Sequence, residues 1–429
     1  MDVAIIGYGV VGSGVAEVIK KNSQSIAARA GEQIKVKKIL DIRDFTEGPD
    51  LDLLTKNPEE VFDDPDIGVV VETIGGARIA FEYTKRAFAM KKHVVTSNKE
   101  LVATHGPELL KMAADNGVSY LFEASVGGGI PIIRPLNQCL AANVINGITG
   151  ILNGTTNYIL SQMRREGRNF ADALKSAQQN GYAEADPTAD IEGHDACRKI
   201  AILSSIAYNE FVDYRNIHTE GITKLSLSDM QYAEAMDSVI KLVAVSRREG
   251  GKIYARVAPA IISKNHPLAN VEDVFNAIVV RGDAIGDAMF YGRGAGKLPT
   301  ASAVIADIID IARHIESGAK NIWVRQDYSN TVPIADSEIR FFIRAAVRNG
   351  IEAAKFIDKT FGKVEYINSG HIEHSGHVAE QAAKPAASPG ELAFATRKET
   401  EAELNRCIDK LKGIGSIREV LNVIRIEED

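Results

Sequence analysis

The chain has 429 residues, of which 45% are hydrophobic and 25% charged, as in an ordinary soluble globular protein of two or three domains. Its formal net charge of −7 argues against a nucleic-acid partner. No apolar run approaches the roughly 20 residues of a membrane span, and no signal peptide is evident, so we expect a cytoplasmic protein without a membrane partner. The cysteines Cys139, Cys197 and Cys407 are few and scattered, which favours reduced thiols.

A glycine-rich turn follows a short apolar run at the start of the chain. Residues 3–6 predict a buried parallel strand, and Gly7, Gly9 and Gly12 follow it at once, before a helical stretch to about Lys21. Gly7 permits the tight turn, Gly9 lets the backbone approach a pyrophosphate, and Gly12 lets the helix pack closely. A glycine pattern placed between a strand and a helix predicts dinucleotide binding.

The end of the second predicted strand, residues 36–42, bears on the choice of cofactor. Asp41 stands at its tip, where an acid would hold a ribose 2′-hydroxyl, and Arg43 follows, where an arginine would accept a 2′-phosphate. Both residue types are present, so NAD and NADP both stay open. Arg43 favours NADP, and a surface arginine without a ligand is the alternative.

Further strands end in features suited to ligand binding. These strands are predicted at residues 69–72, 93–96 and 119–123. Open α/β sheets bind ligands at the carboxyl ends of their strands, so Lys99 is expected near a ligand, although a lysine in solvent would show the same pattern. Gly127–Gly129 could let the backbone approach a nicotinamide or turn carbonyl groups onto a cation.

The chemistry is expected to centre on residues 181–200. A helix is predicted to begin near Asp195, which places Asp195 and Lys199 on one face, four residues apart. Glu184 and Asp190 lie upstream in a loop that could fold over the helix start. Such a group could bind a zwitterionic amino acid and place a proton carrier beside it. The alternative is a solvated helix face worth a few tenths of a kcal/mol.

Three domains are expected. Residues 1–131 form a Rossmann domain, residues 132–327 an α+β catalytic and dimerisation domain, and residues 338–429 a βαββαβ module of ferredoxin-like type. A second glycine-rich loop, residues 292–300, precedes a helix at 301–317 that could return to cover the Rossmann domain. The overall class is α/β.

A histidine-rich segment in the tail raises the question of a metal. His371, His374 and His377 are three residues apart in a strand-to-loop region, so their rings need not converge. We predict no metal site there.

Several motifs resemble those of the homoserine dehydrogenase family. They occur in order over residues 1 to about 315, at residues 7–12, 96–99, 122–131, 153–157 and 181–199. The tail resembles the ACT regulatory domain of many bacterial members. The resemblance implies NAD(P)-dependent interconversion of L-homoserine and L-aspartate 4-semialdehyde, at a branch point towards threonine and methionine.

The resemblance also implies roles for individual residues. Lys199 matches the proton donor and acceptor, and Lys99 the second lysine beside nicotinamide and substrate. Glu184 and Asp195 match the acids at the amino and hydroxyl ends of the substrate, and Asp190 belongs to the same acidic set. The cofactor contacts implied are Gly7, Gly9, Val10, Val11, Gly12, Arg43, Thr73, Lys99 and Gly296. Main-chain oxygens implied for a sodium-like ion are those of Glu123, Val126, Gly128 and Ile130.

The family further implies a homodimer or homotetramer, and an amino-acid effector such as threonine at the ACT domain. Members often carry Asp-Xaa-Pro-Gly at the first loop of that domain, whereas this chain has Val347–Gly350, which puts threonine inhibition in doubt. Two other functions are less consistent with the residues. Aspartate-semialdehyde dehydrogenase needs a nucleophilic cysteine in an electropositive loop, but Cys139 and Cys197 fall in predicted helices. A non-catalytic sensor would not need both lysines and the acids.

Overall fold

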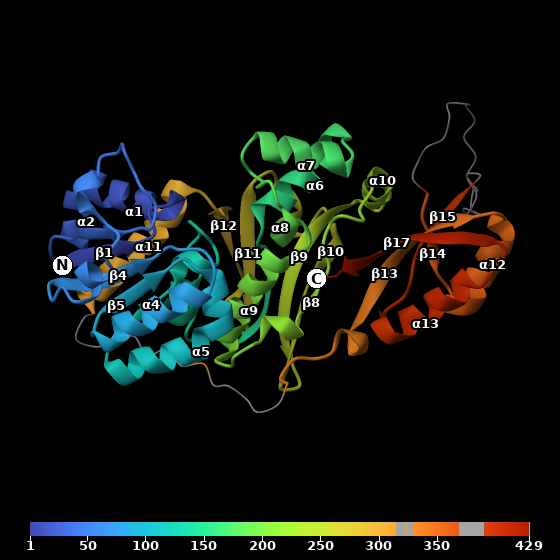
Figure 1. The fold of residues 1–429 in the computed structure, drawn as a ribbon. Coiled ribbons are helices and arrows are strands. Elements are labelled where there is room, and N and C mark those ends of the chain that lie inside the picture. Colours follow the sequence, from blue (N-terminus) through green and yellow to red (C-terminus); the bar gives the residue numbers. More distant parts are fainter. Residues whose placement is uncertain (315–322, 324–328, 369–389, 429) are drawn as a thin grey trace.

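The computed structural model describes residues 1–314, 323, 329–368 and 390–428. Figure 1 shows three parts in a row: an N-terminal part in blue and cyan, a central part in green and yellow, and a tail in orange and red. The segment with His371, His374 and His377 lies outside the described residues. None of the described helices combines the length and apolar character that crossing a bilayer requires.

The N-terminal part is a parallel sheet with helices on both faces, which confirms the predicted Rossmann fold. The strand order is β3-β2-β1-β4-β5-β6. The strands are β1 (Asp2–Ile6), β2 (Lys35–Leu40), β3 (Leu54–Thr55), β4 (Ile67–Glu72), β5 (His93–Thr96) and β6 (Tyr120–Leu121). The helices are α1 (Val10–Lys21), α2 (Ser23–Ala30), α3 (Glu59–Phe62), α4 (Arg78–Ala89) and α5 (Lys99–Asn116).

Alternate residues of the strands enter two separate cores. On β1, Val3 and Ile5 join the core beneath α1 and α2, whereas Ala4 and Ile6 join the core beneath α4 and α5. This alternation follows from the two-residue repeat of a strand. Both faces are therefore apolar, and the carboxyl ends of the strands are left to carry polar chemistry.

Two helices form where local composition alone does not indicate them. Residues 22–33 are mostly polar, but α2 occupies most of them, because Ile26 and Ala30 bury one face and Gly31 ends the helix at φ +86°. Pro107 lies inside α5, which begins at Lys99, where the Asn98 side chain accepts from the Leu101 N–H. The cap, and not the proline, sets the helix start.

The central part is a mainly antiparallel sheet with helices packed on one face (Figure 1). Its strands run in the order β12-β11-β7-β9-β10. They are β7 (Ile145–Ile151), β8 (His218–Thr219), β9 (Ser238–Glu249), β10 (Lys252–Ser263), β11 (Phe275–Gly282) and β12 (Gly286–Arg293). The helices are α6 (Gly154–Glu166), α7 (Phe170–Gln179), α8 (Thr188–Ile191), α9 (His194–Tyr208) and α10 (Leu227–Ala235).

A helix that follows the central sheet packs on the N-terminal part. This helix, α11 (Lys297–Arg313), places Ala301, Val304 and Ile308 in one core with Val3 and Val15. Its contact with α1 is close, because a Cβ on Gly14 would approach the Lys297 carbonyl oxygen to 2.8 Å. The chain thus passes from the N-terminal part to the central part and returns with α11. These two connections hold the two parts side by side.

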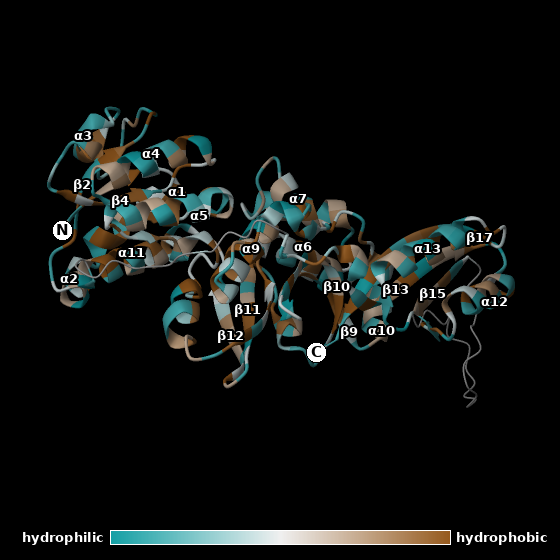
Figure 2. Ribbon diagram, turned by 90° about the horizontal axis from the view of Figure 1, so that it is seen from below, coloured by the Kyte–Doolittle hydropathy of each residue, from teal (hydrophilic) through white to brown (hydrophobic). Residues whose placement is uncertain are grey.

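The tail contains β13 (Glu338–Val347), α12 (Gly350–Phe361), β14 (Glu365–Tyr366), β15 (Glu391–Ala395), β16 (Glu399–Thr400), α13 (Glu401–Lys412) and β17 (Ile417–Glu427). Its strand order β17-β13-β15-β14 is that of a ferredoxin-like βαββαβ module. Parallel pairing of β17 with β10, from Ala260 opposite Arg425 to Ile262 opposite Glu427, joins this sheet to the central one. Figure 2 shows helices such as α1 and α13 with alternating hydrophilic and hydrophobic residues, as helices with one buried face require.

Candidate active site

The first strand and helix form a tight glycine turn. Gly7 adopts φ +95° and donates its N–H to the Leu40 carbonyl over 2.8 Å. Gly12 lies so close beneath the turn that a Cβ would overlap the Gly7 carbonyl oxygen, whereas a Cβ on Gly9 would meet no atom within 4 Å. Val10 is 67% exposed at the start of α1. The free N-terminus of α1 is therefore open to an anionic group such as a pyrophosphate.

The two glycines should respond differently to alanine. Gly12→Ala is expected to lower the melting temperature of the ligand-free protein by several degrees, since the new methyl group displaces the turn. Gly9→Ala should leave that temperature within about a degree and weaken cofactor binding, because only a ligand would meet the added methyl. Thermal melts with and without cofactor measure both effects. Equal destabilisation by the two substitutions would contradict this geometry.

The tip of β2 is organised around one carboxylate. Asp41 accepts from the Tyr8 N–H at 2.7 Å, the Arg43 N–H and Nε at 2.9 Å, and Arg43 Nη2 at 2.7 Å. Hydrogen bonds from Arg43, opposed by burial, lower the pKa of Asp41 to about 2. The Arg43 guanidinium is 55% exposed and lies 5.0 Å from the centre of the Phe45 ring. The acid and the arginine predicted at this tip thus form one pair.

Helix α9 places a carboxylate between two lysines. Asp195 is 3% exposed, and its Oδ2 accepts from Lys199 Nζ at 2.7 Å, one turn along the same helix. Its Oδ1 lies 2.9 Å from Nζ of Lys99, the first residue of α5. Lys199 also donates to the Leu152 carbonyl at 2.8 Å. Asp195 therefore joins a lysine of the N-terminal part to a lysine of the central part.

A third polar residue steadies this carboxylate, and sequence reasoning missed its role. Asn153 caps α6 with its Oδ1, which accepts from the Thr156 N–H at 2.8 Å. Its Nδ2 donates to Asp195 Oδ2 at 2.9 Å and to Asp190 Oδ1 at 2.7 Å. The motif at 153–157 was a usable signal, because an asparagine at a helix start is an N-cap whose amide nitrogen is left free to donate.

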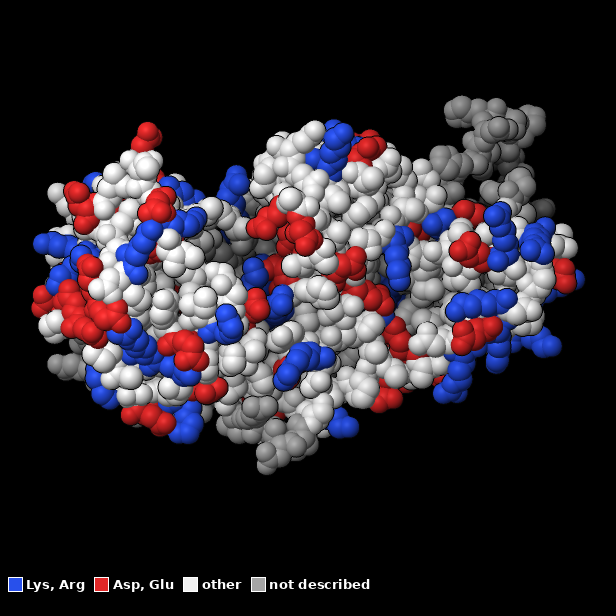
Figure 3. Space-filling view, viewed as in Figure 1, with Lys and Arg blue, Asp and Glu red and all other residues white. Residues whose placement is uncertain are grey.

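The remaining acids lie in the segment that precedes α9. Asp190, expected in a loop, lies in the short helix α8 and is half-buried. Glu184 is exposed between α7 and α8, and in the described part of the chain only its backbone carbonyl is hydrogen-bonded, to Gln178 Nε2. Figure 3 shows acidic side chains gathered over α8, beside the junction of the N-terminal and central parts. The acidic residues of this segment are Glu184, Asp186, Asp190 and Glu192.

Contacts within the cluster shift the pKa values of its acids and of Lys99. Burial opposes ionisation of Asp195, but the ammonium groups of Lys199 and Lys99 hold the pKa of that carboxyl well below its usual range. Asp195 in turn raises the pKa of Lys99. Burial, together with the charge of Asp195, raises the pKa of Asp190. The site therefore holds one firmly ionised carboxylate between two cations, with a less acidic carboxyl next to it.

The two glycine-rich loops pack on each other. A Cβ on Gly128 would overlap the Gly294 carbonyl oxygen, and one on Gly129 would lie 2.7 Å from Pro299 Cβ. Gly296 is exposed at φ +124° and precedes α11. Thr73 lies on the other side of the first turn, where its Oγ1 donates to the Gly7 carbonyl at 2.8 Å. Thr73 thus contacts the turn before α1, and Lys297, at the start of α11, packs against Gly14 of α1.

The loop expected to hold a cation is buried, and its acid is already engaged. The Glu123 carboxylate accepts from the backbone N–H groups of Ile132, Ile133 and Arg134, at 2.6, 2.8 and 2.7 Å. Its side chain is thus an anchor for the following turn. The main-chain carbonyl oxygens of Glu123, Val126, Gly128 and Ile130 stay the predicted ligands of a cation, and a set of neutral oxygens suits an alkali cation.

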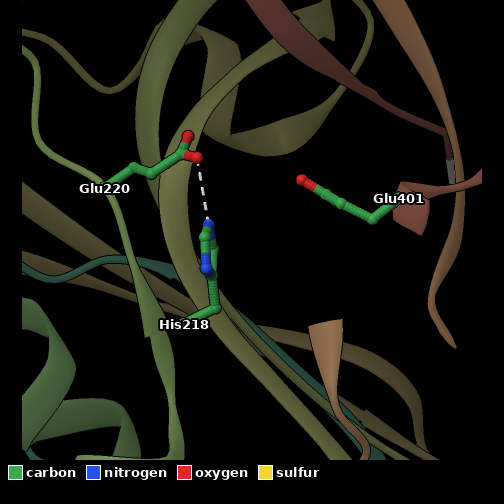
Figure 4. Close-up of side chains that lie close together, drawn as sticks. All are labelled: His218, Glu220 and Glu401. Carbon is green, nitrogen blue, oxygen red and sulfur yellow. Dashed lines mark hydrogen bonds and ion pairs between the residues drawn. The ribbon is translucent and has the colours of Figure 1, made fainter. Parts of the chain in front are cut away.

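One group of described residues has the spacing of a metal site, but an arginine fills it. His218 Nε2 lies 3.0 Å from a carboxylate oxygen of Glu220. Figure 4 shows this hydrogen bond, with Glu401 facing the two residues. Arg425 of β17 donates to Glu220 at 2.6 Å and also pairs with Glu401. Its Nη2 lies 3.2 Å from His218 Nε2. The cluster is therefore an ion-pair network that binds the tail to β8.

The cysteines do not form a nucleophilic site. Cys197 is buried in α9, its Sγ donates to the Tyr214 carbonyl at 3.4 Å, and burial raises the pKa of its thiol. A raised pKa lowers the fraction of thiolate, the form that nucleophilic catalysis requires. Cys139 is exposed in a helical turn at 135–139.

Comparison with known proteins gives a consistent result. The model of the homoserine dehydrogenase family matches residues 131–309, and that of the homoserine dehydrogenase NAD-binding domain matches residues 7–123. A homoserine dehydrogenase of Bacillus subtilis is 36% identical over 433 residues, covering 99% of this chain and 98% of that protein.

Solved structures agree. A homoserine dehydrogenase from Thiobacillus denitrificans superposes with a TM-score of 0.89 at 36% identity, covering 100% of this chain and 98% of its own. A hyperthermophilic archaeal homoserine dehydrogenase in complex with NADPH gives a TM-score of 0.61 at 30% identity, over 72% of this chain and 96% of its own. These matches over nearly the whole chain show that it belongs to the homoserine dehydrogenase family of NAD(P)-binding oxidoreductases.

Proposed function

We propose that the protein interconverts L-homoserine and L-aspartate 4-semialdehyde, with Lys199 carrying the proton. The observation that carries this is the single carboxylate of Asp195, which holds Lys199 and Lys99 together from two separate parts of the fold. The reaction would stand at the branch towards threonine and methionine. The similar proteins are named homoserine dehydrogenases, which supports the substrate pair.

The chain's own residues would handle the proton. Nicotinamide, when bound, supplies the hydride acceptor for the alcohol carbon. The Lys199 amine takes the hydroxyl proton as the carbonyl forms, and returns it in the reverse direction. Asp195 holds that amine in place, and the Lys99 ammonium stabilises negative charge on the substrate oxygen. A lysine base must first lose its own proton, which the nearby charge of Lys99 favours and that of Asp195 opposes.

The acids would hold the amino and hydroxyl ends of the substrate. We propose that Glu184 and Asp195 contact the two ends of homoserine and that Asp190 belongs to the same set. Glu184 is exposed between α7 and α8, where its carboxylate is accessible to an ammonium group. Asp190 is held against Asp195 through Asn153 Nδ2.

We propose NADP as the preferred cofactor, with NAD as the alternative. A carboxylate has about four acceptor positions, and those of Asp41 are taken by Arg43 and the Tyr8 N–H. Ribose hydroxyls would have to displace Arg43, whereas a 2′-phosphate could use its exposed guanidinium. The NADPH bound to the archaeal neighbour supports this preference.

Removing the arginine tests the preference. Arg43→Ala is expected to raise the KM for NADP about tenfold, because the 2′-phosphate loses a partner, and to leave the KM for NAD unchanged or lower it, because acceptor positions on Asp41 are freed for the ribose. Lys56→Ala is the matched control, since it removes an exposed cation paired with Asp44 nearby. Steady-state kinetics with both cofactors gives the answer. Equal changes in both KM values would reject the role of Arg43.

We also propose the domain boundaries, further cofactor contacts, an ion site, an effector domain and an oligomeric state that accompany this function. The domains would run over residues 1–131, 132–327 and 338–429, with α11 returning to the first. Val10, Val11, Thr73, Lys99 and Gly296 would contact the cofactor alongside Gly7, Gly9, Gly12 and Arg43. A sodium-like ion would bind the main-chain oxygens at 123–130 in a structural role. The tail would be an ACT domain for an amino-acid effector, in a homodimer or homotetramer.

The direct test is reduction of the cofactor followed at 340 nm. The protein is expected to reduce NADP in the presence of L-homoserine, and to oxidise NADPH with L-aspartate 4-semialdehyde. Running NAD beside NADP ranks the cofactors. No reduction of either cofactor with homoserine, by protein that binds NADPH, would reject the proposed substrate.

A further inference from the structure

A carboxylate is buried at the carboxyl end of β4, a central strand of the Rossmann sheet that is otherwise apolar. Glu72 ends β4 after three valines and is 1% exposed. It lies between Ile6 of β1 and Thr96 of β5. A buried carboxylate costs free energy unless hydrogen bonds replace its water. No lysine, arginine or histidine of the described part of the chain forms an ion pair with it, so its partners must be neutral.

Those partners form a closed ring. Glu72 Oε1 accepts from the Ile74 N–H at 2.8 Å, and Oε2 accepts from the Thr96 hydroxyl at 2.5 Å. The Thr96 oxygen in turn accepts from the Asn98 N–H at 2.9 Å. Asn98 Nδ2 closes the ring by donating to the carbonyls of Ile74 and Gly76, at 3.1 and 2.8 Å. The ring therefore ties the loop after β4 to the loop after β5.

Each loop leads to one half of the active site. In the first, Thr73 donates to the Gly7 carbonyl, and Ile74 Cγ2 lies 2.9 Å from where a Cβ on Gly7 would be, so this loop supports the glycine turn. In the second, Asn98 caps α5, and the next residue is Lys99, 2.9 Å from Asp195. Glu72 is the group to which both loops are anchored.

We propose that Glu72 is a positioning residue, which sets the distance between the glycine turn and Lys99 by holding both loops on one carboxylate. It touches neither the expected cofactor nor the expected substrate, so its effect on the reaction is transmitted through Ile74 and Asn98. This inference rests on the proposed function for the identity of the reaction. Its geometry does not depend on which cofactor is bound.

The ring needs two acceptor oxygens. Thr96 donates its only hydroxyl hydrogen to Glu72 while accepting from Asn98, so an amide at position 72 would turn an N–H against either this hydroxyl or the Ile74 N–H, and a protonated carboxyl would be a weaker acceptor for both. Burial raises the pKa of Glu72 to about 7, and the Tyr120 phenol on β6 is the titratable group that faces it. Protonation near neutrality should therefore loosen the ring in the same way as Glu72→Gln.

The test combines binding with kinetics. Glu72→Gln and Thr96→Val are each expected to weaken NADPH binding about tenfold, the effect of one lost buried hydrogen bond. Both should also flatten the change in kcat/KM for homoserine between pH 6 and 8. Thr96→Ser keeps the hydroxyl and should behave as the native protein does. Thr84→Val is the matched control, since that buried hydroxyl has no partner in the described residues.

The outcomes separate this inference from the proposed function. Native NADPH affinity and an unchanged pH profile in both Glu72→Gln and Thr96→Val would overturn the positioning role. So would equal losses in Thr96→Ser and Thr96→Val, because they would indicate general damage to the strand. Binding of NADPH is measured by fluorescence without any substrate. Its weakening can therefore be read even if homoserine proves not to be the substrate.

Discussion

Lys199→Ala is expected to lower kcat for homoserine oxidation about a thousandfold, within the usual range for losing a general acid–base group. The Lys199 amine lies 2.7 Å from Asp195 and 2.8 Å from the Leu152 carbonyl, deep in the cluster. Alanine removes the proton carrier but leaves Asp195 paired with Lys99, so no charge is stranded. Cofactor affinity should therefore stay within about threefold of the native value.

Stopped-flow and steady-state rates, together with NADPH titration, measure the two quantities separately. Lys241→Ala is the matched control, since Lys241 is also a buried lysine of the central part, 2% exposed and 3.1 Å from Glu272. That substitution should lower the melting temperature and leave kcat of the folded protein within about twofold. A native kcat in Lys199→Ala would remove Lys199 from the mechanism.

Asp195→Asn is expected to lower kcat about a hundredfold and to raise the KM for homoserine. The two ammonium groups would lose the carboxylate between them and repel each other, and Lys99, with a side chain 43% exposed, could turn towards solvent. The donor Asn153 Nδ2 would then face an amide whose orientation is no longer fixed by charge. Both lysines should therefore lose their fixed positions at the same time.

The direction in which the stability difference between the native protein and Asp195→Asn changes with pH can also be predicted. The folded-state pKa of Asp195 lies below its ordinary value of 3.8, so its ionisation stabilises the fold above about pH 4. That contribution is lost as the pH falls through the lowered pKa. The stability gap between the native protein and Asp195→Asn should be largest at neutral pH and shrink in acid. A gap that widened in acid would contradict the assignment of charges.

An exposed acid of the same segment provides the control. Asp186→Asn alters a carboxylate whose partner is Thr188, outside the lysine cluster. It changes the net charge by the same amount as Asp195→Asn. Its kcat and KM should stay close to the native values, so that any large effect at Asp195 reflects contact with the lysines and not charge alone.

The local chemistry of the site was predictable where it depends on spacing. A pair four residues apart on a helix must share a face, and Asp195 and Lys199 do so with a 2.7 Å contact. The glycine turn was also predictable, because its glycines lie a few residues apart between a strand and a helix. The structure agrees, since Gly12 has no room for a Cβ. Such features are fixed by a few consecutive residues and need no knowledge of the rest of the fold.

Long-range contacts were not predictable in this way. Nothing in the sequence near Asn153 shows that its amide meets Asp190 and Asp195, about 40 residues away in the chain. The ring of Glu72, Thr96 and Asn98 likewise depends on the order of β4 and β5 in the sheet. The joining of the tail to the central sheet depends on pairing of β17 with β10, and strand order is not encoded in local periodicity.

The position of the substrate relative to one amine tests the mechanism most directly. A crystal structure with homoserine and the oxidised cofactor bound should place the substrate hydroxyl oxygen about 2.6–3.2 Å from Lys199 Nζ, or one water away, with the alcohol carbon facing the nicotinamide. A hydroxyl oxygen turned towards solvent, with Lys199 Nζ still held only by Asp195 and Leu152, would contradict the assignment of this lysine as the proton carrier.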